Sequence, residues 1–336
     1  VYEGDTLYLQ PCVSPVWDTA WAVIALHESG IPSTHPALQK AGQWLIIKEV
    51  RNFGDWALKC KVEEPSGWYF QYANEFFPDT DDSAAVLMAL QRVSLPESSN
   101  KEKAFLRGLR WIQAMQCDDG GWGAFDRNNN KTLLNYIPFA DFNALLDPST
   151  SDVTARCIDF LGCIGFSRTY KNVKKAIELL KKEQEKDGSW FGRWGANYIY
   201  GTWSVLSGLT SVCENANEPY IKKAADWLKS VQNADGGWGE TIKSYDDPSL
   251  RAVGNSTSSQ TAWALMALFY AGEVSSNTVK RGIEFLLTKQ NEDGSWDENE
   301  FTATGFPKVF YLKYHMYRNY FPLYALGKYR NLIQKS

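Results

Sequence analysis

Apolar residues recur at helical spacing along the chain, each time ahead of a phrase that is repeated four times. The phrase runs from a glutamine through an Asp-Gly pair to a tryptophan six residues later, at 116–122, 184–190, 232–238 and 290–296. The residues 4, 7 and 11 positions before each glutamine are apolar, which is the spacing of one face of a helix. The four stripes consist of Phe105, Leu109 and Ile112, of Val173, Ile177 and Leu180, of Ile221, Ala225 and Leu228, and of Val279, Ile283 and Leu286.

Each repeat predicts a helix that stops at the Asp-Gly turn, where glycine can adopt the left-handed conformation that closes the last turn, followed by an indole that packs back onto the helix. We interpret these phrases as structural braces between helices, so the chemistry must be sought where the pattern breaks. A weaker copy precedes the four, with Leu38, Gly42, Leu45 and Glu49 in the stripe and Trp56 closing it.

A second, more apolar helix precedes most copies of the repeat. These helices are expected at Trp17–Ser29, Asp82–Arg92, Asp152–Cys163, Gly201–Cys213 and Ser258–Ala271. Since less polar helices belong inside, the alternation predicts an all-α fold, a single α/α toroid (α6–α6 barrel) with an inner and an outer ring. The repeats run through nearly the whole chain, so we expect one domain over residues 1–336, although the length alone suggests about two.

Composition narrows the classes of function. Lys+Arg 35 against Asp+Glu 39 leaves no basic excess, which disfavours nucleic-acid binding. The six cysteines form no C-x-x-C pair and the three histidines are dispersed, so we expect neither a metal site nor a cofactor. Without a membrane-spanning run or a signal-peptide pattern, we expect a cytoplasmic protein. The oligomeric state stays open.

Three carboxylates, Asp79, Asp81 and Asp82, lie between two phenylalanines and an apolar helix. An N-terminal helix cap explains one of them well and three poorly. Crowded carboxylates cannot all ionise cheaply, so at least one pKa is expected to rise and that carboxyl to stay protonated near neutrality. Among aromatic rings, which make up 14% of the chain, such a group is a Brønsted acid suited to an alkene, because π faces stabilise the resulting carbocation.

The run Asp79-Thr80-Asp81-Asp82, together with the repeats, resembles the class II terpene cyclases and specifically the squalene-hopene cyclases. The resemblance extends from about residue 14 to 328, with further matches at 14–19, 70–72, 152–155, 190–201, 259–268 and 305–317. It implies an apolar isoprenoid substrate, no cofactor, and peripheral contact with a membrane as a route of substrate uptake. Those enzymes are pairs of α/α barrels that enclose the substrate, and this chain covers only the barrel with the acid.

By this resemblance Asp81 is the general acid that protonates the terminal alkene, while Asp79 and Asp82 tune its proton and fix its orientation. Arg156 stands where the family has a histidine that Asp152 positions. An arginine would make Asp81 a stronger acid but cannot pass a proton on, so we expect reprotonation by another route, such as water held by Tyr200. A structural ion pair between Arg156 and Asp152 is the plainer alternative, and both interpretations are compatible.

The resemblance also implies which residues line the cavity and steady the migrating cation. They are Trp17, Phe70, Phe125, Trp194, Phe306, Phe310, Leu312, Tyr314 and Tyr317. Phe125 replaces the usual tyrosine of the family, which leaves the ring pattern of the product open.

Without the second barrel, a shorter polyprenyl chain with a polar head is the substrate we expect. The leading hypothesis is cyclisation of a geranylgeranyl chain on a dihydroxybenzoate head to a fused-ring meroterpenoid, as in single-domain cyclases of the merosterolic acid type. The alternatives are a squalene-hopene cyclase fragment acting on squalene and a non-catalytic helical-repeat binding module.

Overall fold

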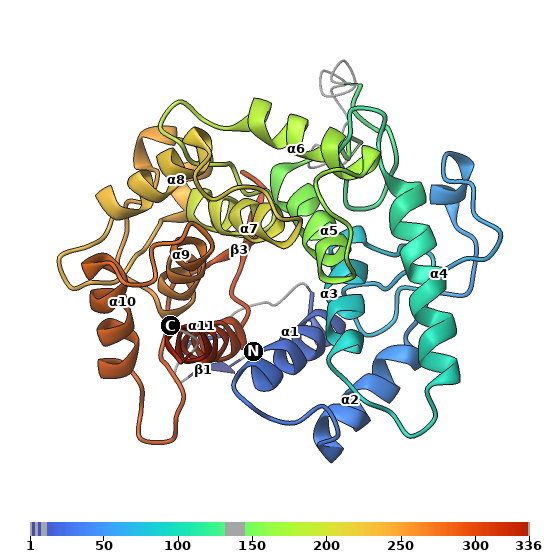
Figure 1. Cartoon of the computed structure of the whole chain (residues 1–336), viewed down its shortest axis with the longest axis horizontal. Coiled ribbons are helices and arrows are strands. Elements are labelled where there is room, and N and C mark those ends of the chain that lie inside the picture. The colour runs from blue at the N-terminus through green and yellow to red at the C-terminus, as the bar shows by residue number, and fades with distance from the viewer. Residues whose placement is uncertain (1, 4–5, 8–11, 132–144, 335–336) are drawn as a thin grey trace.

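Six helices form a closed inner ring in the structure, a computed structural model that describes residues 2–3, 6–7, 12–131 and 145–334 (Figure 1). Helices adjacent in the ring pack against each other, and the last packs against the first. The six are α1 (Pro15–Glu28), α3 (Thr80–Gln91), α5 (Ser151–Cys163), α7 (Tyr198–Ser211), α9 (Ser258–Tyr270) and α11 (Tyr317–Ile333).

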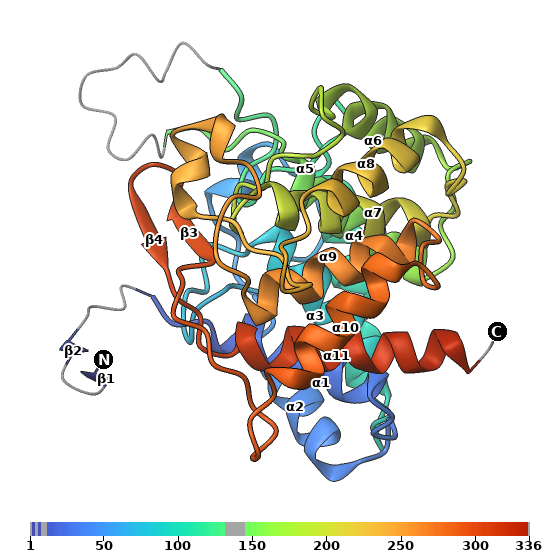
Figure 2. The ribbon, with the colours of Figure 1, turned by 90° about the vertical axis from the view of Figure 1, so that its left-hand side faces the viewer.

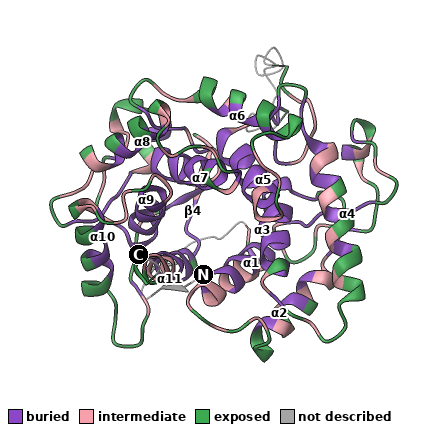
Figure 3. Cartoon of the chain, in the orientation of Figure 1, coloured by how far each residue is buried: buried purple, intermediate pink, exposed green. Residues whose placement is uncertain are grey.

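Five further helices lie outside this ring in the described ranges. They are α2 (Pro36–Ile47), α4 (Ser99–Met115), α6 (Lys171–Glu183), α8 (Pro219–Ser230) and α10 (Asn277–Thr288). The inner helices α3, α5, α7 and α9 are buried along nearly their whole length and α1 and α11 over a smaller part, whereas the outer helices bury only one face (Figure 3). The predicted all-α toroid with two rings is therefore confirmed. None of these helices, within the described part of the chain, is long and apolar enough to cross a membrane.

The ring contains one inner helix that the pattern did not predict. The other inner helices were recognised by an apolar run and by the Gln-to-Trp repeat that follows it. Helix α11 has neither signal, because its residues are mixed around Pro322 and no repeat follows it. It closes the ring by packing between α9 and α1.

The short elements precede the first helix or lie between later ones. Strands β1 (Tyr2–Glu3) and β2 (Thr6–Leu7) pair antiparallel, as do β3 (Ala303–Phe306) and β4 (Phe310–Leu312). In the described ranges, 3-10 helices span Asp55–Leu58, Ile242–Tyr245 and Pro248–Leu250. The β3–β4 hairpin lies at one end of the ring and the C-terminal end of α11 at the opposite end (Figure 2).

The first three Gln-to-Trp repeats join consecutive outer helices, as their structural interpretation predicts. In all four, the indole Nε1 donates to the backbone carbonyl ten residues earlier, at 2.7–2.8 Å. In the first repeat, Gln116 Nε2 donates to the carbonyls of Gly120 (2.8 Å) and of Asn172 in α6 (2.9 Å). Gly120 has φ +99°, and an added Cβ would come within 2.7 Å of the Lys175 backbone. The glycine was expected to close the last turn of the helix. In the structure it closes the separate turn that follows the glutamine instead.

The weaker first copy is closed by a different tryptophan from the one expected. Trp68, not Trp56, donates its Nε1 to the Leu45 carbonyl at 2.7 Å. Glu49 takes the place of the glutamine and reaches the next outer helix through an ion pair with Arg107 at 2.6 Å. The sequence does not reveal that Trp68 corresponds to the tryptophan of the other repeats. The loop after Glu49 is longer, so Trp68 lies far beyond the six-residue spacing of those repeats.

Candidate active site

The three carboxylates lie at the start of α3, where a tight turn delivers them to one place. Asp79 is the N-cap, and its Oδ1 accepts hydrogen bonds from the backbone N–H groups of Asp81 (2.7 Å) and Asp82 (3.2 Å). Thr80 fixes the same turn by donating its hydroxyl to the Gly123 carbonyl at 2.6 Å. The cap therefore holds Asp81 and Asp82 in the first turn, with all three carboxylates buried.

Burial is the main cause of the unusual acidity of this cluster. It raises the pKa of Asp81 to about 7, against the opposing effect of Arg156. Burial and mutual repulsion raise the pKa values of Asp79 and Asp82 well above their usual range. This agrees with the expectation that crowding keeps at least one of the three carboxyls protonated near neutrality.

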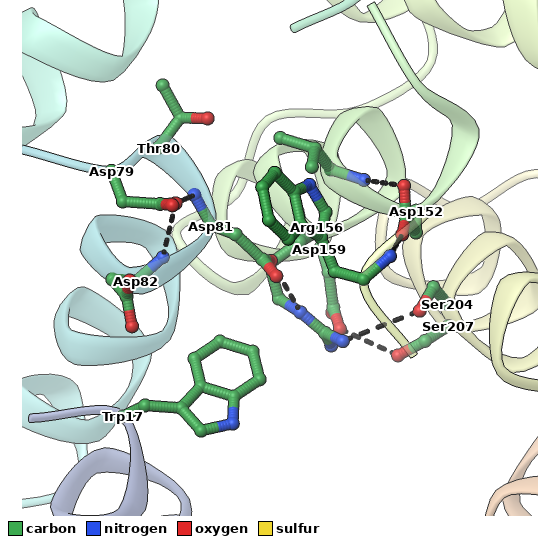
Figure 4. Close-up of polar contacts among 12 residues, drawn as sticks. Trp17, Asp79, Thr80, Asp81, Asp82, Asp152, Arg156, Asp159, Ser204 and Ser207 are labelled. Atoms are coloured by element: carbon green, nitrogen blue, oxygen red, sulfur yellow. Dashed lines mark hydrogen bonds and ion pairs between the residues drawn. The ribbon is translucent and has the colours of Figure 1, made fainter. Parts of the chain in front are cut away.

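Arg156 contacts Asp81 directly from the neighbouring helix α5 (Figure 4). Its Nε lies 3.2 Å from Asp81 Oδ1, and its Nη2 donates to Ser204 Oγ at 3.4 Å. The guanidinium lies between the rings of Trp21 and Trp203, with its carbon 4.7 and 4.8 Å from their centroids. A fully buried cation thus has an ionisable acid as its direct partner.

Asp152 does not form the expected ion pair with Arg156. Its carboxylate accepts hydrogen bonds from the Thr150 hydroxyl (2.6 Å), the Val153 N–H (3.0 Å) and the Trp194 N–H (2.9 Å). It therefore accepts from an N–H of the first turn of α5 and anchors the loop that carries Trp194, while the cation pairs with Asp81 instead. The reason is geometric, because the long arginine side chain reaches past Asp152 to α3.

Tyr200 at the start of α7 completes the polar end of the site. It is fully buried, and Asp81 and Arg156 both act on its pKa, which burial raises well above its usual value. The hydroxyl is therefore neutral beside the acid.

All nine residues expected to line the cavity do so. They surround a cavity of about 300 Å³ whose wall also includes Asp79, Asp81, Asp82 and Tyr200. Trp17 Nε1 donates to the Tyr317 hydroxyl at 3.0 Å, which fixes two of the rings relative to each other. The first turns of α1, α3, α7 and α11 contribute to this cavity, so these inner helices begin at the same end of the ring.

Six further residues line the cavity and were not singled out from the sequence: Cys12, Gln71, Asn74, Phe77, Thr304 and Gly305. Phe77 lies in the acidic segment and Gly305 in the matched segment 305–317, so the sequence already pointed to the segments that contain them. Gly305 allows close packing in the hairpin, since an added Cβ would lie 2.1 Å from the Phe310 ring. Gln71 lies inside the matched segment 70–72, whereas Asn74 is a polar loop position that carried no sequence signal of its own.

An inner ring with a buried Brønsted acid facing aromatic rings defines a protein of the class II terpene cyclase type. The chain belongs to the squalene-hopene cyclase family, because the family model "Squalene-hopene cyclase C-terminal domain" matches residues 13–331.

Among its relatives, the squalene-hopene cyclase of Bradyrhizobium diazoefficiens is 52% identical over 99% of this chain and 51% of its own length. That of Alicyclobacillus acidocaldarius is 48% identical over 99% of this chain and 54% of its own. The chain therefore spans about half the length of the curated relatives it matches.

The solved structure of the type II terpene cyclase MstE from Scytonema has the same fold. It superposes with a TM-score of 0.68 at 17% identity, covering 97% of this chain and 92% of that one. At this identity the likeness concerns the fold alone.

Proposed function

We propose that the chain is the catalytic domain of a class II terpene cyclase, in which Asp81 starts polycyclisation of a linear polyprene by protonating an alkene. The observation that carries this proposal is the Asp81 carboxyl, which has a pKa of about 7 and lies in the wall of a cavity lined by aromatic rings. At neutral pH about half of the molecules would hold the proton needed for the reaction.

The first step transfers one proton without any other reactant. Arg156 binds Asp81 Oδ1, so the other carboxyl oxygen is left to carry the proton. The O–H bond breaks as the alkene π electrons form a C–H bond, which leaves a carbocation on the substrate and a carboxylate on Asp81. Arg156 stabilises that carboxylate, and the neutral rings of the cavity stabilise the cation as it moves.

The substrate class that the relatives favour is a squalene-type polyprene. Relatives named squalene-hopene cyclase are 46–52% identical to this chain, whereas MstE is 17% identical. This moves the preferred substrate from the prenylated aromatic acid to the hydrocarbon. The two share the initiating step, because each offers a terminal alkene to the acid.

A prenylated aromatic acid is the second candidate. MstE has been solved in complex with geranylgeranyl dihydroxybenzoate as its substrate, and it matches this chain over nearly its whole length. Gln71 and Asn74 add neutral polar groups to the cavity wall, where a polar head could bind.

The experiment incubates the purified protein, and its Asp81→Asn variant, with squalene and with geranylgeranyl dihydroxybenzoate. We expect cyclic products from squalene with the wild type and none with the variant. Cyclisation of the aromatic acid alone would transfer the proposal to the second candidate. A variant as active as the wild type would refute the role of Asp81.

A further inference from the structure

A line of buried and half-buried polar side chains continues from Asp81 into the interface between α5 and α7, away from the cavity. On each helix these residues recur at intervals of three and four, which places them on one face. The line consists of Arg156, Asp159 and Cys163 on α5, and of Tyr200, Ser204, Ser207 and Ser211 on α7. The cyclisation chemistry described above uses only the end of this line that lies beside Asp81.

Asp159 is the unexplained group in this line. It is 8% exposed, and its Oδ2 accepts a hydrogen bond from Ser207 Oγ at 2.6 Å. Its Oδ1 accepts a second hydrogen bond from Ser211 Oγ. Among the described residues, Arg156 and Arg92 lie near enough to Asp159 to interact with its charge. A buried carboxylate held by two hydroxyls is costly, so its charge needs a compensating group nearby.

Arg156 has the complementary problem. Its ion pair is with Asp81, and that partner must be protonated, hence neutral, before each reaction cycle. Its Nη1 has no hydrogen-bond partner, although the guanidinium is fully buried. When Asp81 holds its proton, the two flanking indole rings alone are a weak substitute for an anion. Asp159 lies one helical turn from Arg156 on α5, beside the Arg156–Ser204 contact (Figure 4).

We propose that Asp159 is the counter-ion of Arg156 in the resting state, and so a positioning residue that lets Asp81 hold its proton near neutral pH. This inference rests on the proposed role of Asp81. With the Asp159 charge in place, Arg156 is partly neutralised and attracts the Asp81 anion less strongly. Without that charge, the full cation favours the Asp81 carboxylate, and Asp81 releases its proton at a lower pH.

Other charged and titratable groups face the same two carboxylates and remain unchanged in the test. Those that act on or lie near Asp159 are Arg156 and Cys163 of α5, Arg92 beyond the end of α3, and Tyr324 and Lys328 of α11. A second set of groups interacts electrostatically with Asp81. It consists of Asp79 and Asp82 beside it, Asp152, Arg156 and Cys157 of α5, Tyr200 of α7, and Tyr317 of α11.

The test titrates the Asp81 carboxyl directly by infrared difference spectroscopy, using its protonated C=O band. Asp81→Asn identifies the band, because that variant lacks it. Asp159→Asn removes the charge but keeps the shape, and Asp159→Ser is a second neutral variant should the first not fold. Asp159→Glu retains the charge. Asp226→Asn is the matched control, since it removes a carboxylate that is 72% exposed on the outer helix α8.

We expect both neutral variants to move the Asp81 titration to lower pH by about one unit, with Asp159→Glu and Asp226→Asn close to the wild type. The alkaline limb of the pH profile of cyclisation should shift by the same amount. A titration unchanged in the neutral variants would overturn the role of Asp159. Because the spectroscopic titration needs no turnover, it separates this failure from failure of the proposed function, which would appear as absence of cyclisation in the wild type.

Discussion

The buried acid makes the folded protein less stable as the pH rises, and this cost can be measured. Asp81 has a pKa of about 7 in the folded protein and an ordinary value of 3.8 when exposed. Between these pH values the folded chain binds a proton that the unfolded chain releases, so the free energy of unfolding falls as pH increases. About three pKa units at about 1.4 kcal/mol each give a loss of about 4 kcal/mol, complete above pH 7.

Replacing Asp81 with asparagine should remove this cost, since the amide cannot ionise. We expect Asp81→Asn to match the wild type in stability near pH 4 and to exceed it by about 4 kcal/mol at pH 8, while cyclisation is lost. Urea unfolding followed by circular dichroism at both pH values measures the difference. The raised pKa values of Asp79 and Asp82 add slopes of the same sign in both proteins, so they largely cancel in the comparison.

The control for this experiment is Asp226→Asn, which changes an exposed carboxylate and should alter stability by no more than about 0.5 kcal/mol at either pH. If the advantage of Asp81→Asn were the same at pH 4 and pH 8, the acid would not be held protonated by its burial. The reasoning about its acidity would then be wrong.

Three further predictions concern Arg156 and the repeats. Arg156→Met removes the cation that favours the Asp81 carboxylate, so the alkaline limb of the activity profile should rise by about 1–3 pH units; an unmoved limb would exclude this coupling. Trp68→Phe removes the indole donor from the Leu45 carbonyl, which keeps only the Lys48 N–H, and should lower the free energy of unfolding by about 0.5–1.5 kcal/mol more than Trp56→Phe, whose indole N–H has no partner. Equal losses would contradict the reassignment of the first repeat. Gly120→Ala should cost more in urea unfolding than Gly165→Ala, because both have positive φ but only Gly120 packs against a neighbouring backbone.

The helical pattern predicted five of the six inner helices, because helices buried on several sides consist mainly of small and apolar residues. It missed α11, where aromatic and charged residues mix around Pro322 and no repeat follows. It also assigned Trp56 to the first repeat, because an insertion after Glu49 displaces Trp68 from the usual spacing.

The candidate site was more predictable in its residues than in their contacts. The nine cavity positions and the acid motif came from the resemblance, and the structure places all of them around one cavity. The partner of Arg156 could not be read from the sequence, because Asp81 and Asp152 were both available and the choice depends on the reach of a side chain across α3 and α5. Asp159 carried no signal, since a carboxylate three residues after an arginine is an ordinary feature of a helix.

The most direct test of the central claim is cyclisation in deuterium oxide, with the product analysed by mass spectrometry and NMR. If Asp81 protonates the terminal alkene, its exchangeable proton becomes a deuteron, and each cyclic product should carry one deuterium on the ring methylene next to the gem-dimethyl carbon of the first ring. Asp81→Asn should form no such product. Cyclic product without deuterium at that position, or formed equally by the variant, would contradict initiation by Asp81.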